Sequence, residues 1–239
     1  MFVMMVGVFR SKKEENVLKG IRLFEPFSKE ELGNICKIGG PTAIQGMVYC
    51  MISMVLTRMV AAFGAEAIAT QRVGGQIESV SWNTADGFAA ALNAFVGQNY
   101  GAKKMDRVQK GYRISFWTVA IWGALIMLAF IIFPGPIAGV FFHEEKAMEI
   151  AISYLIIIGF SEAFMCVELM TIGALSGLGK TKLCSVISIT ATSMRIPLAM
   201  VLSRTSLGLD GIWWALTLTS VAKGIIFYLT FRYQMREKC

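Results

Sequence analysis

The sequence has little charge and a single histidine. Charged residues make up 16% of the 239 positions, whereas 55% are hydrophobic. A soluble domain carries roughly 25% charged residues, so the composition excludes that class and predicts a membrane protein. Neither a Ser-His-Asp or Cys-His nucleophile arrangement nor a usual zinc set can be assembled around His143 alone. We therefore expect no enzyme, no metal site and no bound cofactor.

The sequence also lacks paired cysteines and a true phosphate-binding loop. No CxxC motif occurs, and the scattered cysteines are expected to pack within helices and not to form disulfides. Residues 174–181, ALSGLGKT, approach the pattern G-x-x-x-x-G-K-[ST], but the first position is Ala174 and the stretch follows an apolar helix. We expect Gly177 and Gly179 to end that helix, with Lys180 at the membrane interface.

Long apolar segments are abundant instead. Six segments reach the roughly 20 residues that cross a bilayer, at positions 39–63, 66–99, 111–133, 147–175, 183–203 and 208–231. They predict an all-α membrane protein with one six-transmembrane-helix bundle over residues 39–239. Residues 1–9 are a shorter apolar run, interpreted as the remnant of a preceding transmembrane helix. A polar linker follows over 10–38, with a capping-box pattern from Ser28 to Glu31 that opens a short helix.

The positive charges gather in alternate loops. The linker, the loop near Lys103, the loop at Lys180 and the C-terminal tail hold most of the cations, whereas the opposite loops contain only Lys146 and Arg204. Because cytoplasmic loops accumulate Lys and Arg, we expect a multi-pass protein of the cell membrane with its linker and C-terminus in the cytoplasm. The basic stretch near Lys103 has only Tyr112 as an interleaved aromatic residue, so no nucleic-acid partner is expected.

The segment over residues 66–99 carries two acids at membrane depth, Glu78 and Asp86. At about 100° per residue, both fall with Trp82 on one polar arc of the helix. The apolar remainder, which includes Val80, is expected to pack against other helices. The segment over 39–63 has a similar polar arc, with residues Gln45, Tyr49 and Ser53. The methionines of residues 47–59 are interpreted as lipid-facing or packing residues, or as a soft drug-binding wall.

Two interpretations of the acids in the second segment are open. They form a structural pair neutralised by Arg195 or Lys223, or they bind a cation or proton inside a transport pathway. Arg195 stands next to Pro197 and is expected to be a structural charge that anchors a bent helix by bonding carbonyls. Lys223 has three candidate partners, Asp86, Glu162 and Glu168.

Several stretches resemble a known transporter family: GGPTAIQGM, IESVSWNTADGFAAALNAFVGQNYGAKKMDRV, ALSGLGKTK, MRIPLAMVLSR and LGLDGIWWALTLTS. From Gly39 onward the sequence is similar to the second half of a multidrug and toxic compound extrusion (MATE) transporter. This resemblance implies two six-helix bundles joined by a cytoplasmic linker, in a twelve-helix antiporter. It also implies export of drugs and other cationic or amphipathic organic compounds in exchange for Na⁺ or H⁺.

The sequence departs from that family in two respects. It holds one bundle, and its first segment lacks the acid that many sodium-linked members have there. The resemblance therefore implies that the coupling Na⁺ or H⁺ is bound by residues outside this sequence or by Glu78, Asp86 or Glu168. The residues expected to line the substrate cavity are Gln45, Tyr49, Ser53, Trp82 and Lys223.

We expect the chain to be the C-terminal half of a longer transporter, completed by a missing N-terminal bundle or by a second copy of itself. Its other partners are the lipid bilayer and small organic substrates. Two alternatives are open. A lipid-linked sugar flippase of the same superfamily would have a more strongly cationic cavity. A transport-inactive membrane fragment would act only as an assembly partner.

Overall fold

The computed structural model describes residues 28–236, and in this range the chain is helical without a strand. The helices are α2 (Lys29–Ala61), α3 (Ala65–Gly101), α4 (Met105–Ile132), α5 (Pro134–Gly139), α6 (Glu145–Gly159), α7 (Glu162–Gly177), α8 (Thr181–Ser193), α9 (Arg195–Leu202) and α10 (Leu209–Arg236). The chain divides into two compact units, residues 1–37 and 38–239. The expected helix remnant at 1–9 and most of the linker lie outside the described residues.

Four stretches of the described chain are long and apolar enough to cross a membrane. They are Gly39–Ala61 within α2, α4, the joined pair α8 and α9, and α10. α6 and α7 pass the same test together but are bent by 50° at their break, so the pair is either a fifth, broken span or a re-entrant loop. The polar-striped second segment forms α3, which has 37 residues. The prediction of an all-α membrane bundle is therefore confirmed.

α2 begins earlier than the apolar segment that it contains. The Glu31 backbone N–H donates to Ser28 Oγ at 3.1 Å, and Ser28 Oγ donates to Glu31 Oε2 at 2.7 Å. Ser28 thus satisfies one of the free N–H groups of the first helical turn. The expected short helix is the first part of the 33-residue α2.

Two predicted segments are broken into pairs of helices. α8 ends at Ser193 and α9 begins at Arg195. The break follows from Pro197, which has no N–H for the Ser193 carbonyl and whose ring crowds that carbonyl. At the break between α6 and α7, Ser161 Oγ donates to the Ile158 carbonyl at 2.8 Å. Such a local side-chain bond competes with helical bonding and bends the chain.

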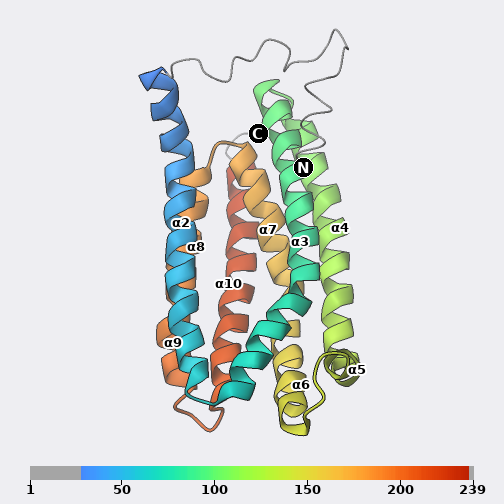
Figure 1. Cartoon of the computed structure of the whole chain (residues 1–239). Helices are drawn as coiled ribbons and strands as arrows, with labels where there is room; N and C mark the ends of the chain where they lie inside the picture. Colours follow the sequence, from blue (N-terminus) through green and yellow to red (C-terminus); the bar gives the residue numbers. More distant parts are fainter. Residues whose placement is uncertain (1–27, 237–239) are drawn as a thin grey trace, which may run out of the picture. The chain divides into compact units, whose positions relative to one another are not determined.

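α7 lies inside the unit 38–239, against α3, α4 and α10 (Figure 1). Its approach to α3 depends on two glycines four residues apart. A Cβ at Gly173 would lie 2.3 Å from the Ala89 carbonyl oxygen, and one at Gly177 would lie 2.6 Å from the Asn93 carbonyl oxygen. The two backbones therefore touch, as small residues allow between membrane helices. The expectation that α7 ends near Gly177 is confirmed.

The packed face of α3 is made largely of small residues. Its buried positions include Ala67, Thr70, Gly74, Ser81, Ala85 and Ala89. Val80 and Phe88, which belong to the apolar remainder of this helix, are 60% and 38% exposed, so the prediction that this face packs is wrong for them. Lipid tails are as apolar as these side chains, so close backbone contact favours helix association more than apolar burial does.

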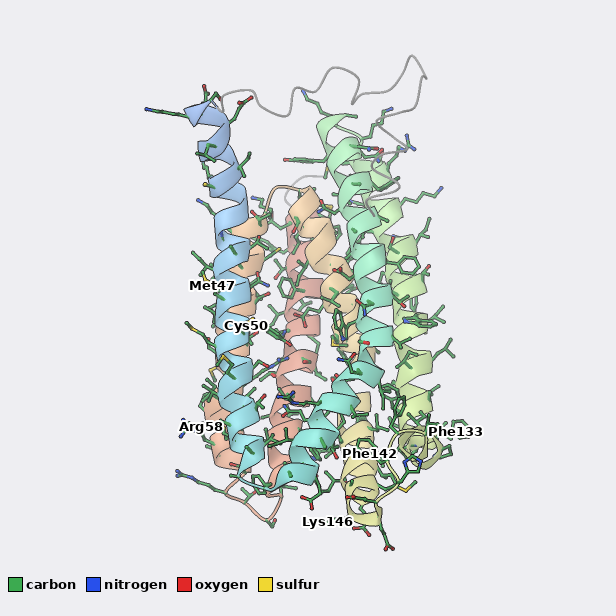
Figure 2. All side chains as sticks on the ribbon, in the orientation of Figure 1. Met47, Cys50, Arg58, Phe133, Phe142 and Lys146 are labelled. Atoms are coloured by element: carbon green, nitrogen blue, oxygen red, sulfur yellow. The ribbon has the colours of Figure 1, made fainter. Side chains whose placement is uncertain are left out.

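α2 is attached to the other helices mainly through one stretch of its length. Ile52, Leu56 and Val60 pack in a cluster with Ala199 of α9 and with α10 residues. Toward its N-terminal side the helix is exposed, and Met47 points away from the other helices (Figure 2). Cavities lie between α2 and the helices α3, α7 and α10, and they form the candidate site.

Candidate functional site

Two neighbouring cavities of about 750 Å³ and 460 Å³ occupy this space. Polar residues of five helices line both of them: Tyr49 of α2, Glu78 and Trp82 of α3, Thr192 of α8, Arg195 of α9 and Ser220 of α10. The polar arcs of α2 and α3 thus face a common interior. The methionines at positions 47, 51 and 54 of α2 are more than half exposed and belong to neither lining. Their interpretation as lipid-facing residues fits this placement.

Glu78 is the acid shared by the two cavities. It lies about 20 Å along α3 from the first residue of the helix, at 1.5 Å per residue. The hydroxyl of Tyr154 in α6 donates a hydrogen bond to Glu78 Oε1. The ring of Tyr154 rests against Gly74, where a Cβ would lie 2.2 Å from Tyr154 Cε1. The glycine one turn before Glu78 therefore makes room for the residue that holds the carboxylate.

Arg195 stands at the start of α9 and lines both cavities. Its Nε donates to Thr219 Oγ1 at 3.0 Å, and its Nη2 donates to Ser220 Oγ at 2.8 Å. The guanidinium is thus held by hydroxyls of α10, and the expectation that it bonds carbonyls is wrong. Its charge also acts on Glu78, but no ion pair within 4.0 Å joins the two among the described residues. A structural pair neutralised by direct contact is therefore not formed there.

Lys223 pairs with Glu168, one of its three candidate partners. The ammonium Nζ lies 2.8 Å from Glu168 Oε1, and the residues are 7% and 5% exposed. Both residues line the smaller cavity. A buried carboxylate and ammonium in contact compensate each other's charge. The Glu168 carboxylate is therefore paired with a cation of the chain itself, whereas the Glu78 carboxylate has no ion pair among the described residues.

The positions of Asp86 and Glu162 differ from what helical periodicity predicts. Asp86 is exposed and belongs to neither cavity lining, although it shares the predicted arc with Glu78. Glu162 is fully buried, and neither oxygen of its carboxylate has a hydrogen bond within 3.5 Å among the described residues, although the Ser81 hydroxyl lies near enough to act on it. It lies near enough to Glu78 for the two charges to interact. The sequence did contain a signal for Glu162, because an acid inside the apolar segment 147–175 is costly and indicates a functional residue.

The remaining predicted cavity residues all reach the interior. Gln45 and Lys223 line the smaller cavity, Ser53 the larger one, and Tyr49 and Trp82 both. Tyr49 and Trp82 are 53% and 41% exposed as whole residues. Their roles in binding stay predictions. Across the part of the chain that the structure describes, no group of three or more His, Cys, Asp or Glu side chains is placed to hold a metal ion.

Comparison with known proteins gives a consistent set of relatives. The MatE family model matches residues 41–201. The probable multidrug resistance protein NorM of Thermotoga maritima is 28% identical over 211 residues, covering 84% of this chain and 45% of that protein. The probable multidrug resistance protein YoeA of Bacillus subtilis is 24% identical over 238 residues, covering 99% of this chain and 51% of that protein.

The solved structures agree in fold. A crystal structure of MATE in the straight conformation superposes with a TM-score of 0.87 at 19% identity, covering 99% of this chain and 54% of that one. This chain spans about half the length of the curated relatives it matches. The names of these relatives, which refer to multidrug resistance, therefore apply to proteins about twice as long as this chain.

Proposed function

Because the chain belongs to the MatE family of membrane transporters, we propose that it forms one lobe of an ion-coupled antiporter that exports amphipathic organic compounds. The observation that carries the proposal is the placement of Glu78. This carboxylate lines two polar cavities within the helix bundle and is held by Tyr154, without an ion pair among the described residues. An ionisable group inside a bundle of membrane helices is costly, so its presence indicates a functional site.

The coupling ion binds at Glu78, with Glu162 as the second acid of the site. Their charges repel when both are ionised, and the only side chain that acts on the buried Glu162 carboxylate as a hydrogen-bond donor among the described residues is Ser81. One proton or one Na⁺ beside Glu78 removes the repulsion between the two acids. The Tyr154 hydroxyl holds the carboxylate in place in either case. Asp86 and Glu168 were the other predicted coupling residues, but the first is exposed and the second is paired with Lys223.

The substrate occupies the cavity space beside the coupling acid. Trp82 stacks on aromatic or cationic groups, and Tyr49, Gln45 and Ser53 add polar contacts along α2. Charges of both signs line the cavities, which supports an amphipathic substrate over the lipid-linked sugar of the flippase alternative. Binding of the ion lowers the negative charge that attracts a cationic substrate. Ion entry and substrate release are then linked through one carboxylate.

The proposed lobe needs a second lobe to complete the substrate cavity. The matched relatives are about twice as long as this chain, and the N-terminal side of α2 is exposed. The opposite wall of the cavity comes from an N-terminal bundle or from a second copy of the chain. The basic end of the bundle, which contains Lys103 and Lys104, faces the cytoplasm together with the C-terminus, whereas Lys146 lies at the other end.

Ion binding to the lobe itself provides the test. The purified chain is heated in detergent over a range of Na⁺ concentrations and pH values, because an ion that binds only the folded state raises the unfolding temperature. We expect this stabilisation in the wild-type chain and in Asp86→Asn, and its loss in Glu78→Gln. Unchanged stabilisation in Glu78→Gln would exclude the assigned coupling site. Ethidium flux into vesicles against a Na⁺ or pH gradient then distinguishes a transporter from an inactive assembly partner.

A further inference from the structure

A third cavity, of about 450 Å³, lies between the first half of α4 and the last turns of α10. It shares no lining residue with the two cavities of the proposed transport site. α4 begins and α10 ends at the same end of the unit 38–239 (Figure 1). Three arginines line the cavity, Arg113 from α4 and Arg232 and Arg236 from α10. The proposed transport path makes no use of them.

Within residues 28–236, which the structure describes, no acid lines this cavity to balance the three arginines. Among the described residues the only ion pairs are those of Lys146 with Glu66 and of Lys223 with Glu168. The guanidinium groups are therefore available to a bound anion. Arginine binds phosphate well because its planar fork offers several N–H donors in a fixed geometry.

Aromatic rings join the two helices and place one of the arginines. Tyr112 and Phe231 stack with ring centroids 3.6 Å apart, and Phe116 lies against Tyr228 with centroids 5.1 Å apart. The guanidinium carbon of Arg232 lies 5.8 Å from the centroid of the Tyr228 ring. Packed aromatic rings thus form part of the cavity wall, and the Arg232 cation stands over one of them.

A narrow apolar cavity continues from the basic one. Its volume is about 260 Å³, and it shares Phe116 and Tyr228 with the basic cavity. It runs between α4, α7 and α10, past Ala120, Ala163 and Gly224. Larger side chains at these positions would fill the space. The joined cavities therefore have a cationic end and a hydrocarbon-like end, which matches the two ends of a membrane lipid.

The depth of the site also fits a lipid. Arg113 is about 12 Å along α4 from its first residue, at 1.5 Å per residue. Trp117 and Ile121 follow at four-residue intervals on the same side of the helix and are 61% and 58% exposed. Tryptophan is enriched at the headgroup level of membranes. The arginines therefore lie near the headgroups and the apolar groove lies below them.

We propose that this composite cavity between α4 and α10 binds an anionic glycerophospholipid. Its phosphate contacts Arg113, Arg232 and Arg236, and one acyl chain lies in the groove beside Ala120. Basic pockets between transmembrane helices bind anionic headgroups in this way. A bound lipid would tie α4 to α10 at the end where α10 finishes. This role is independent of the coupling ion and of the exported compound.

The test measures lipid binding to the purified, delipidated chain by native mass spectrometry. Phosphatidylglycerol is compared with phosphatidylcholine, and glycerol 3-phosphate is added as a soluble competitor. The double variant Arg113→Gln/Arg232→Gln should bind phosphatidylglycerol roughly thirtyfold more weakly, given the usual contribution of each basic residue near an anionic surface. Arg204→Gln, at an exposed position outside the cavity, is the matched control and should bind like the wild type.

A second variant tests the groove without changing charge. Ala120→Phe should weaken phosphatidylglycerol binding at least fivefold, whereas Ala90→Phe, at an exposed position on α3, should leave it unchanged. Equal affinity for phosphatidylcholine would overturn the proposal, as would binding by the double arginine variant within twofold of the wild type. Displacement of the lipid by millimolar glycerol 3-phosphate would also overturn it, since the site would then recognise a free anion.

Discussion

The buried ion pair between Lys223 and Glu168 allows a quantitative test of the interior. The two residues are 7% and 5% exposed, and Nζ lies 2.8 Å from Oε1. Removing one partner of such a pair costs about 3–5 kcal/mol because an uncompensated charge stays buried. The pair lines a cavity that admits water, so we expect the lower value for Lys223→Met and for Glu168→Gln. A loss of about 3 kcal/mol lowers the unfolding temperature by about 6–12 °C in a chain of this size.

The double variant Lys223→Met/Glu168→Gln removes both charges and separates pairing from packing. It should recover at least half of the loss, because replacing a complete buried pair by uncharged groups is often nearly neutral. Unfolding is followed in detergent by the fraction that remains monodisperse after heating. Lys146→Met is the control, since Lys146 pairs with Glu66 at 3.4 Å with its side chain 72% exposed, and such a pair contributes at most about 1 kcal/mol.

Two results would refute this reasoning about the interior. If Lys223→Met is no more destabilising than Lys146→Met, the ammonium is not held in the buried position that the structure describes. If the double variant loses as much as the two single variants together, the two side chains act independently. Either result would also remove the reason for treating Glu168 as compensated and Glu78 as the coupling acid.

Two further predictions concern packing and substrate contact. Gly173→Ala places a Cβ 2.3 Å from the Ala89 carbonyl oxygen, so it should lower the stability measured in the same heating assay by about 1–3 kcal/mol. Gly87→Ala, with nothing within 4 Å of the new Cβ, should be neutral or stabilising. Trp82→Ala should weaken ethidium binding, measured by fluorescence titration, about fivefold, and Trp82→Phe should restore most of it. Full affinity in Trp82→Ala would remove this ring from the substrate site.

The sequence predicted the side of α3 that faces the cavity better than the side that packs. Glu78 and Trp82 share the predicted polar arc and line the larger cavity, because helical periodicity alone determines which residues share a face. Asp86 lies on nearly the same arc but two turns further along, beyond the cavity lining. Where a cavity ends along a helix depends on the neighbouring helices, and the sequence of α3 carries no signal for it.

The sequence by itself determined the membrane class, the helical segments and the end of α7 at Gly177, because hydrophobicity and backbone preference act over a few neighbouring residues. Only the tertiary structure decided which charges meet. Lys223 and Glu168 are 55 residues apart in the chain, and Tyr154 and Glu78 are 76 apart. Their contacts depend on how each helix is rotated and on how closely the backbones approach. That approach is decided where two helices meet, as at Gly173 against Ala89.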